Sequence, residues 1–183
     1  MIIGITGPIA SGKSVLVEML IEKRFVYHKL SEEVREEAKK LGIAIERKAL
    51  QDLGNAMREK YGNGYWAERL VPKMTSDANH VVDGIRNPGE IETLRKAGNF
   101  ILIGVDAPVE KRFQWILSRN KDSDPKTIDE IRAIDSRDRG VGESNSGQQS
   151  GKCYEMADLY LHNEGTFEDL SKKIADMLED LKC

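Results

Sequence analysis

The chain has 183 residues, of which 39% are hydrophobic and 32% are charged, and its formal net charge is −3. This composition suits one soluble α/β domain and excludes a nucleic-acid surface built on a basic stripe. The sequence has no apolar run of roughly 18 residues, which a membrane-spanning helix needs. Its two cysteines, Cys153 and Cys183, lie far apart without histidine partners, so we expect neither a disulfide framework nor a zinc site. We therefore expect a cytoplasmic protein, monomeric or homodimeric, that binds neither nucleic acid nor membrane.

The first predicted elements surround a phosphate-binding loop. Ile2–Thr6 is a β-branched run typical of a buried strand, and a helical pattern covers residues 15–22. The segment between them matches G-x-x-x-x-G-K-[ST], whose backbone N–H groups wrap a triphosphate at a helix N-terminus. We expect ATP here, with Lys13 as a catalytic residue on the β- and γ-phosphates and the Ser14 hydroxyl on Mg²⁺. The nucleotide-binding residues that this predicts are Gly7, Pro8, Ile9, Ala10, Ser11, Gly12, Lys13, Ser14 and Val15.

Alternating strand and helix patterns continue through the next part of the chain. They predict a strand at Phe25–Lys29, helices at Ser31–Leu41, Arg47–Tyr61 and Trp66–Met74, and a strand at Asn79–Asp83. Ser31 is the predicted N-cap of its helix, with two glutamates in the first turn and Gly42 after its end. Pro72 is expected to bend or shorten the helix that contains it.

The remaining elements follow in the same alternation. We predict helices at Asn87–Ala97, Val109–Arg119, about 126–136 and Thr166–Leu181, strands at Phe100–Val105 and Leu159–His162, and a short helical turn at Cys153–Met156. Residues 137–152 are rich in Gly, Ser and Gln, which predicts a mobile loop. The alternation indicates a doubly wound parallel sheet in one domain over residues 1–183, with its ligand beyond the carboxyl ends of the strands. Residues 30–78 would form a helical acceptor-binding insert, and residues 119–152 a lid.

Asp83 is the candidate partner of the phosphate-binding loop. It follows two buried β-branched residues at the end of a predicted strand, where a Walker-B carboxylate holds the hydration shell of Mg²⁺. Since a phosphate-binding loop needs such a partner, we assign Asp83 to metal binding and catalysis rather than to a simple turn.

Arginine placement points to a second anionic ligand. Phosphoryl transfer depends on neutralising charge, so it calls for guanidinium groups from several elements. Arg35 and Arg86 follow the carboxyl ends of two predicted strands and are our acceptor-binding candidates, together with Ser31. Arg119 and Arg137 flank a segment that would close over the nucleotide, so we predict them as catalytic lid residues. Further candidates are Arg112, Arg132 and Arg139, whereas we assign Arg24, Arg47, Arg58, Arg69 and Arg95 to the surface.

Other polar and aromatic residues have weaker signals. Gln148 and Gln149 would either read a base or belong to a flexible polar loop, and the loop is the favoured interpretation. Tyr65 and Trp66 would either stack on a base or belong to the core, and the core is favoured.

These motifs together resemble the P-loop nucleoside-monophosphate kinases. In adenylate kinases a Ser/Thr…Arg helix similar to Ser31-x-x-x-Arg35, and a segment similar to Asp83-Gly-x-Arg86, grip the acceptor nucleotide, while lid arginines grip the donor. The resemblance implies a three-layer fold with a five-stranded parallel sheet of order 2-3-1-4-5. It also implies that Asn163 and Gly165 lie where adenine binds. Neither the longer lid nor the zinc knuckle of adenylate kinases is present.

Two other groups share parts of the sequence. Ser11-Gly-Lys-Ser14 and the run Ala157–Gly165 look like dephospho-CoA kinases, but this chain lacks their acidic residue directly after the second strand. The likeness that spans almost the whole chain is to ATPases described as nucleotide-kinase-like, carried by motifs such as Val82–Pro88 and Asp124–Thr127. A P-loop domain joined to deoxycytidylate deaminases has a run similar to Gly147–Asp158, which points to deoxynucleotides.

Three functions remain open from the sequence. The leading one is a Mg·ATP-dependent kinase that acts on a small phosphorylated acceptor, a (deoxy)nucleoside monophosphate. The second is a dephospho-CoA kinase, with Glu32, Glu33 or Asp83 as the base on a ribose hydroxyl. The third is a regulatory nucleotide-binding ATPase module, with residues 137–152 facing a partner.

Overall fold

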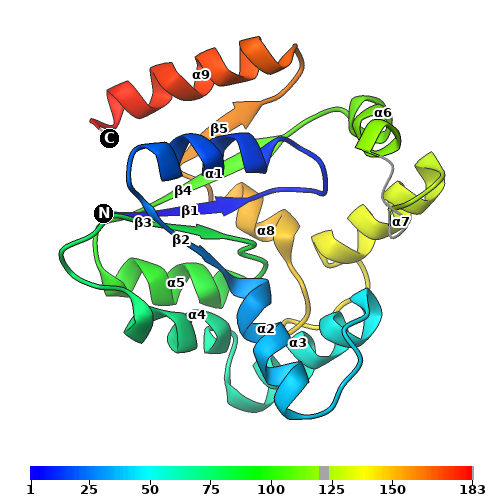
Figure 1. Cartoon of the computed structure of the whole chain (residues 1–183). Helices are drawn as coiled ribbons and strands as arrows, with labels where there is room; N and C mark the ends of the chain where they lie inside the picture. Colours follow the sequence, from blue (N-terminus) through cyan, green and yellow to red (C-terminus); the bar gives the residue numbers. More distant parts are fainter. Residues whose placement is uncertain (120–123, 183) are drawn as a thin grey trace.

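The protein is built around a five-stranded parallel sheet with the strand order β2-β3-β1-β4-β5 (Figure 1). The computed structural model describes residues 1–119 and 124–182. The strands are β1 (Ile2–Thr6), β2 (Val26–Lys29), β3 (His80–Asp83), β4 (Phe100–Asp106) and β5 (Leu159–His162). This order and the α/β class confirm the predicted fold. In the register of the sheet, Ile5 of β1 lies opposite both Asp83 and Ile103, so the carboxyl ends of the central strands meet at one edge.

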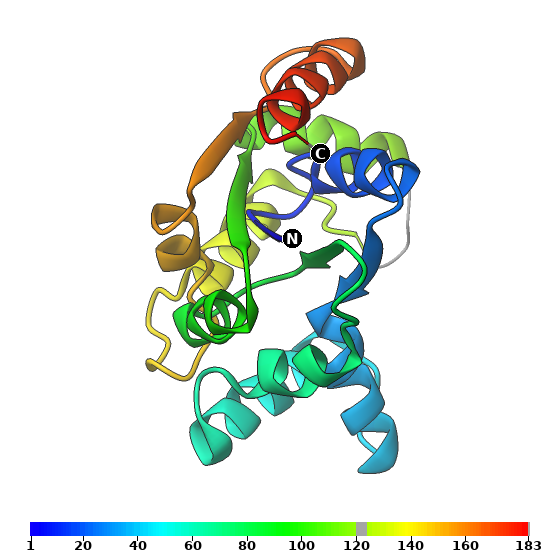
Figure 2. The same cartoon turned by 90° about the vertical axis from the view of Figure 1, so that its left-hand side faces the viewer.

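Helices cover both faces of the sheet. They are α1 (Lys13–Glu22), α2 (Leu30–Lys40), α3 (Arg47–Tyr61), α4 (Tyr65–Leu70), the 3₁₀ helix η1 (Val71–Lys73), α5 (Pro88–Ala97), α6 (Val109–Arg119), α7 (Ile128–Arg139), α8 (Ser150–Glu155) and α9 (Phe167–Asp180). α1 and α9 pack on one face, and α4, α5 and α8 on the other, while α2–α4 gather at the end opposite α9 (Figures 1 and 2). None of the helices in the described ranges is long and apolar enough to span a membrane.

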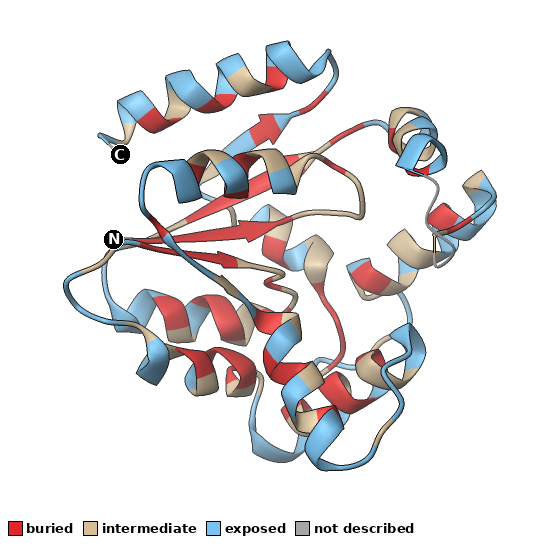
Figure 3. Ribbon diagram, in the orientation of Figure 1, coloured by how far each residue is buried: buried red, intermediate tan, exposed pale blue. Residues whose placement is uncertain are grey.

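The central strand supplies both cores because side chains alternate across a strand. Ile2 of β1 belongs to the cluster under α4 and α5, whereas Ile3 and Ile5 belong to the cluster under α1 and α9. Every residue of β1 is buried, as Figure 3 shows for the middle of the sheet. A parallel sheet covered on both faces requires such a continuous apolar run, which is why this strand was readable from the sequence.

Two helix boundaries differ from their prediction. Ser31 is not an N-cap, because α2 begins one residue earlier at Leu30 and Lys29 takes the cap position without a side-chain cap bond. The predicted helix at Trp66–Met74 is shorter in the structure, where α4 ends at Leu70. Pro72 lies in the first turn of the 3₁₀ helix η1 that follows, which agrees with the predicted shortening by this proline. The predicted start of α5 is confirmed: Asn87 caps it, and the carboxylate of Glu90 completes a capping box.

The prediction of a mobile loop over residues 137–152 is wrong at both ends of that segment and at its two glutamines, whereas residues 140–149 do form a connection without helix or strand. α7 continues to Arg139, and α8 begins at Ser150. Gln148 and Gln149 are buried rather than part of a solvated loop, and the N–H of Gln149 donates to the Arg86 carbonyl at 2.6 Å. Residues 120–123, part of the predicted lid, lie outside the described residues.

A buried ion pair joins the helices to the sheet. Nη2 of Arg58 on α3 lies 2.9 Å from Oε1 of Glu90 on α5. The two side chains are only 5% and 0% exposed. The second carboxylate oxygen of Glu90 accepts hydrogen bonds from the backbone N–H groups of Arg86 and Asn87, at 2.8 Å and 3.2 Å. Glu90 therefore satisfies the end of α5 and fixes the loop after β3 at the same time.

Replacing Glu90 by Gln tests this role. Glu90→Gln leaves the Arg58 charge buried without a counter-ion, so we expect the free energy of unfolding to fall by about 3–5 kcal/mol. Urea unfolding measures the change. Glu92→Gln is the matched control, because Glu92 is an exposed residue of the same helix. Equal stability of the two variants would contradict the assignment.

Candidate active site

The phosphate-binding loop links β1 to α1 in a conformation that depends on its glycines. Gly7 has φ 138° and Gly12 has φ 104°, and Ala10 between them also has a positive φ of 58°. A Cβ on Gly7 would lie 2.0 Å from the Val105 carbonyl oxygen, and one on Gly12 would lie 2.7 Å from the Asn163 side-chain nitrogen. The motif glycines are therefore required here by both backbone angle and space.

The N-terminus of α1 opens toward the loop. The helix begins at Lys13, and its N-cap residue Gly12 provides no side-chain cap. The first N–H groups and the positive end of the helix dipole are therefore available to an anion. This arrangement fits the phosphates of a nucleotide.

Lys13 folds back onto its own loop. Its Nζ donates hydrogen bonds to the carbonyl oxygens of Gly7 and Pro8 at 2.9 Å and 2.5 Å. Burial lowers the pKa of Lys13 to about 8, and the negative charges of Asp83 and Asp138 oppose this shift. A buried ammonium with neutral partners is costly, so an incoming phosphate would stabilise the charged form.

Asp83 lies beside the loop at the end of β3. One carboxylate oxygen, Oδ2, accepts a bond of 3.5 Å from the Tyr27 hydroxyl of the neighbouring strand. The other, Oδ1, is buried without a hydrogen-bond partner among the described residues. An orphaned carboxylate oxygen next to a phosphate-binding loop fits the water shell of Mg²⁺, with the exposed hydroxyl of Ser14 as the direct ligand.

Two adjoining cavities meet at the carboxyl ends of the strands. The first, called the phosphate-loop cavity, measures about 530 Å³ and includes Thr6, Gly7, Ser11–Ser14, Asp83, Arg119 and Asp138 in its lining. The second, called the helical cavity, measures about 430 Å³ and includes Val34, Arg35, Leu50, Gln51, Gly54, Arg58, Trp66, Glu90 and Gln148. Both are lined by Ile9, Lys29, Ser31, Arg47, Gly84 and Arg86. The shared cationic side chains therefore stand between the two cavities.

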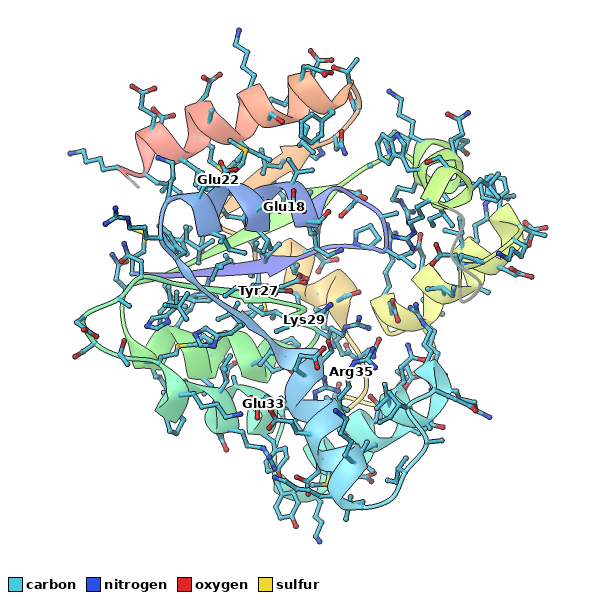
Figure 4. All side chains as sticks on the ribbon, viewed as in Figure 1. Glu18, Glu22, Tyr27, Lys29, Glu33 and Arg35 are labelled. Atoms are coloured by element: carbon cyan, nitrogen blue, oxygen red, sulfur yellow. The ribbon has the colours of Figure 1, made fainter. Side chains whose placement is uncertain are left out.

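Two of the three predicted acceptor residues lie at this junction. Ser31 and Arg86 line both cavities, while Arg35 lines the helical cavity alone. In Figure 4, Tyr27, Lys29 and Arg35 follow one another from the sheet down into α2. Arg35 pairs with the exposed Glu32 at 3.5 Å, and its side chain is 40% exposed, so its guanidinium is accessible.

The predicted lid arginines have different surroundings. Arg119 lines the phosphate-loop cavity and is held by Asp124 through two hydrogen bonds of 2.5 Å and 2.7 Å. Arg137 instead bonds Asp52 at 2.8 Å and Glu143 at 3.1 Å, and it is absent from the described lining of both cavities. The structure brings Arg119 to the site and directs Arg137 away from it.

Asn163 supports the loop from behind rather than lining either of the two cavities. Its side-chain amide donates to the Ser11 carbonyl at 3.2 Å, and its backbone N–H donates to the Asp106 carbonyl at 2.8 Å. Gly165 lies beside Asp169 in the first turn of α9. Arg112, a further candidate, is also a scaffold residue: it is buried, pairs with Asp135 at 2.5 Å and donates to the Ile9 carbonyl at 3.2 Å.

The assignment of Arg58 to the surface is wrong, whereas Arg47 is exposed as predicted but also belongs to the site. Arg58 is buried against Glu90, and Arg47 lines both cavities. With Gln51 and Gly54 they form one face of α3, at i, i+4, i+7 and i+11. That spacing lies beside the apolar stripe of α3, but every amphipathic surface helix has a polar stripe next to an apolar one, so the pattern did not distinguish these residues from solvated ones.

The depressed pKa of Lys13 gives a pH dependence. Between pH 8 and 10.5 the folded chain has lost the Lys13 proton while the unfolded chain retains it. The free energy of unfolding, relative to Lys13→Met, should therefore rise with pH in this range, by up to about 1.4 kcal/mol per pH unit. Chemical denaturation at several pH values measures it, with the exposed Lys39→Met as control. If the difference in free energy of unfolding between the wild type and Lys13→Met does not change with pH, the burial of the Lys13 charge is contradicted.

Comparison with known proteins defines the group to which the chain belongs. No protein-family model matches it. It is similar to a UPF0200 protein of Sulfurisphaera tokodaii, with 32% identity over 178 residues, covering 97% of this chain and 96% of that protein. A UPF0200/UPF0201 protein of Archaeoglobus fulgidus is 32% identical over 183 residues, but the chain spans only 54% of its length.

Solved structures show the same fold. A shikimate kinase from Aquifex aeolicus has a TM-score of 0.54 and 22% identity, covering 100% of this chain and 98% of that one. A dephospho-CoA kinase from Campylobacter jejuni has a TM-score of 0.58 and 14% identity, covering 98% and 96%. With a P-loop kinase-like fold and a relative matched along nearly the full length of both sequences, the chain belongs to the UPF0200 family.

Proposed function

We propose that the protein is a Mg·ATP-dependent phosphotransferase whose acceptor is a small phosphorylated molecule, a (deoxy)nucleoside monophosphate. The observation that carries this proposal is the junction of the two cavities. Lys29, Arg47 and Arg86 line both of them, which places cations between a phosphate-binding loop and a second ligand pocket. Phosphoryl transfer between two anionic substrates requires positive charge at that position.

The donor side would use residues that the loop already orients. The backbone from Gly7 to Ser14 and the Lys13 ammonium would hold the phosphates, and Arg119 would lie over them from the start of the lid. Ser14 and Asp83 would hold Mg²⁺, which neutralises charge on the transferred group when bound. Because the hydrogen bonds of Lys13 to described residues go to loop carbonyls, it can exchange them for phosphate oxygens without leaving its cavity.

The acceptor side fits a molecule with one charged end and one flat apolar end. Ser31 and Arg86 lie at the junction, and the remaining lining of the helical cavity includes the charged Arg35 and the apolar Val34 and Leu50. Its volume of about 430 Å³ lies within the usual range of small-molecule sites. Trp66 is fully buried, as expected for core, and its indole N–H donates to the Gly54 carbonyl at 3.2 Å. The buried indole therefore backs the wall of the helical cavity and offers no exposed face to a ligand.

The dephospho-CoA kinase alternative is disfavoured by the acidic residues available on α2. A ribose hydroxyl needs a general base, and Glu32 and Glu33 are the candidates next to β2. Glu33 is turned toward Lys73 and Arg69, with ion pairs of 2.5 Å and 3.6 Å, and Glu32 pairs with Arg35. Neither glutamate belongs to the described lining of the two cavities. An acceptor that is already anionic needs no such base.

A regulatory module is the second candidate function, supported by one observation. The Archaeoglobus fulgidus relative extends well beyond the matched region and is named UPF0200/UPF0201. An additional region joined to a nucleotide-binding chain is the arrangement expected of a switch that acts on a partner. Steady ATP hydrolysis without any acceptor would favour this function over a kinase.

An acceptor panel tests the proposed function. The protein is incubated with Mg·ATP and each ribo- and deoxyribonucleoside monophosphate, with dephospho-CoA as a further acceptor, and ADP release is measured. We expect at least one monophosphate to stimulate ADP release above the ATP-only rate. No stimulation by any monophosphate would overturn the proposal, and stimulation by dephospho-CoA alone would replace it with the alternative.

Arg35→Ala tests the placement of the acceptor. Since Arg35 lines only the helical cavity, its loss should raise the acceptor KM by roughly tenfold, as for a charged hydrogen bond, and leave ATP affinity unchanged. Lys39→Ala is the matched control, because Lys39 is exposed one turn further along α2 and lines neither cavity. A loss of ATP affinity in Arg35→Ala with normal acceptor kinetics would show that the acceptor is misplaced.

A further inference from the structure

A carboxylate, Asp138, stands among the cations at the junction of the two cavities. It belongs to the last turn of α7, is 7% exposed and lines the phosphate-loop cavity. Its Oδ2 accepts a bond of 3.0 Å from Arg47, and its Oδ1 accepts one of 2.9 Å from the Gln51 amide. Arg86 lies 3.6 Å from Oδ1.

These three donors come from elements that are far apart in the sequence. Arg47 and Gln51 lie one turn apart on α3, and Arg86 lies in the loop after β3. Two arginines and an amide that converge on one pair of oxygens form the kind of site that binds phosphate as well as carboxylate. Among the described residues, the charged side chains shared by both cavities are all cationic: Lys29, Arg47 and Arg86. Asp138, which lines the phosphate-loop cavity, therefore faces a cluster of positive charge.

The orientation of the surrounding amides is fixed by this network. A carboxylate only accepts hydrogen bonds, so Gln51 must present its NH₂ group to Asp138. A guanidinium only donates, so Gln148 must present its oxygen to Arg86, at 2.9 Å. The site is therefore set up to donate to an anion, whichever anion occupies it.

We propose that Asp138 occupies, in the ligand-free protein, the place that the acceptor's phosphate takes. Acceptor binding then exchanges a carboxylate for a phosphate on Arg47, Gln51 and Arg86. The identification of this phosphate with the acceptor rests on the proposed function, whereas the exchange itself does not. A phosphomonoester has more charge and one more oxygen than a carboxylate, so it can displace Asp138 without breaking the donor set.

The exchange has a structural consequence for the end of α7. Besides its side-chain bonds to α3, Asp138 accepts a bond of 2.7 Å at its carbonyl from the Ser150 hydroxyl, which ties α7 to the start of α8. Once its carboxylate is displaced, the described connection between α7 and α3 depends on the more exposed pair Arg137–Asp52. Acceptor binding would thus loosen the last turn of α7 from α3, whereas Asn145 and Gly147 stay held by the Asn87 amide.

Phosphate binding by an Asp138→Asn variant tests the exchange. Asn keeps the shape of the side chain but removes the competing charge, so we expect inorganic phosphate to bind at least tenfold more tightly than to the wild type, measured by isothermal titration calorimetry. Asp52→Asn is the matched control: it also removes an ion pair between α3 and α7, but outside both cavities, and should leave phosphate affinity unchanged. Equal affinity of wild type and Asp138→Asn would overturn the proposal.

A second variant assigns the site, because the phosphate-binding loop also binds inorganic phosphate. In the double variant Arg47→Ala/Asp138→Asn the gain in affinity should disappear, since one of the two arginines is gone. Hydrogen exchange gives an independent readout: phosphate should accelerate exchange of the amides in the last turn of α7, residues 136–139, in the wild type, and Asp138→Asn should show the faster rate without phosphate. A gain in affinity that survives the loss of Arg47 would place the ligand elsewhere and overturn the proposal.

Turnover separates this proposal from the proposed function. Tighter phosphate binding by Asp138→Asn in a protein that phosphorylates no acceptor would support the exchange and reject the kinase. A kinase in which Asp138→Asn loses kcat, with phosphate affinity unchanged, would make Asp138 a general base for a hydroxyl acceptor and reject the exchange. Phosphate binding thus tests the exchange, and turnover tests the kinase, so the failure of one proposal can be told from the failure of the other.

Discussion

The carboxylate of Glu90 joins three parts of the molecule that the candidate site requires. One oxygen accepts from the Arg58 guanidinium of α3 at 2.9 Å, and the other accepts from the N–H groups of Arg86 and Asn87. A fully buried charge is tolerated only when such partners compensate its lost hydration. Through this one group, the helix that carries Arg47 and Gln51 is held at a fixed distance from the loop that carries Arg86. The position of the helical cavity relative to the sheet follows from that connection.

The donor side is stabilised by a separate set of buried polar contacts. Arg112 donates to the Ile9 carbonyl and Asn163 to the Ser11 carbonyl, so the phosphate-binding loop is supported by side chains from α6 and from the end of β5. Lys13, by contrast, donates to two carbonyls of its own loop, those of Gly7 and Pro8. Side chains of the surrounding scaffold thus donate hydrogen bonds to the loop, while Lys13 can still donate to a ligand in the cavity.

Sequence reasoning succeeded where local chemistry decides structure. The Asn87-Pro88 start of α5 and the glycine-lysine-serine loop follow from capping and from backbone angles, which a few neighbouring residues determine. The strand order came from the family resemblance, not from any pattern within the strands. Helix boundaries were predicted wrongly where a polar residue fits both the N-cap and the first turn of a helix. Ser31 is the example: serine is typical of an N-cap, but Ser31 lies inside α2.

The residues that the sequence did not reveal depend on partners far along the chain. Arg58 is buried because it pairs with Glu90, which lies 32 positions further along the sequence. Arg47 bonds Asp138, which lies 91 positions further along the sequence. The end of α7 is ordered by the same contact, so a Gly- and Ser-rich composition predicted mobility that the tertiary structure removes. Electrostatic partners of this kind leave no local signature, because each member taken alone has the composition of a solvated helix face.

The position of Trp66 gives the protein an optical property. Its indole is fully buried and lines the helical cavity, where its N–H is held by the Gly54 carbonyl. The chain contains two tryptophans, and the other, Trp115, lies on α6. In a chain with Phe at position 115, all tryptophan emission would therefore come from the wall of this cavity. The fold thereby contains its own fluorophore at the pocket where the second substrate is proposed to bind.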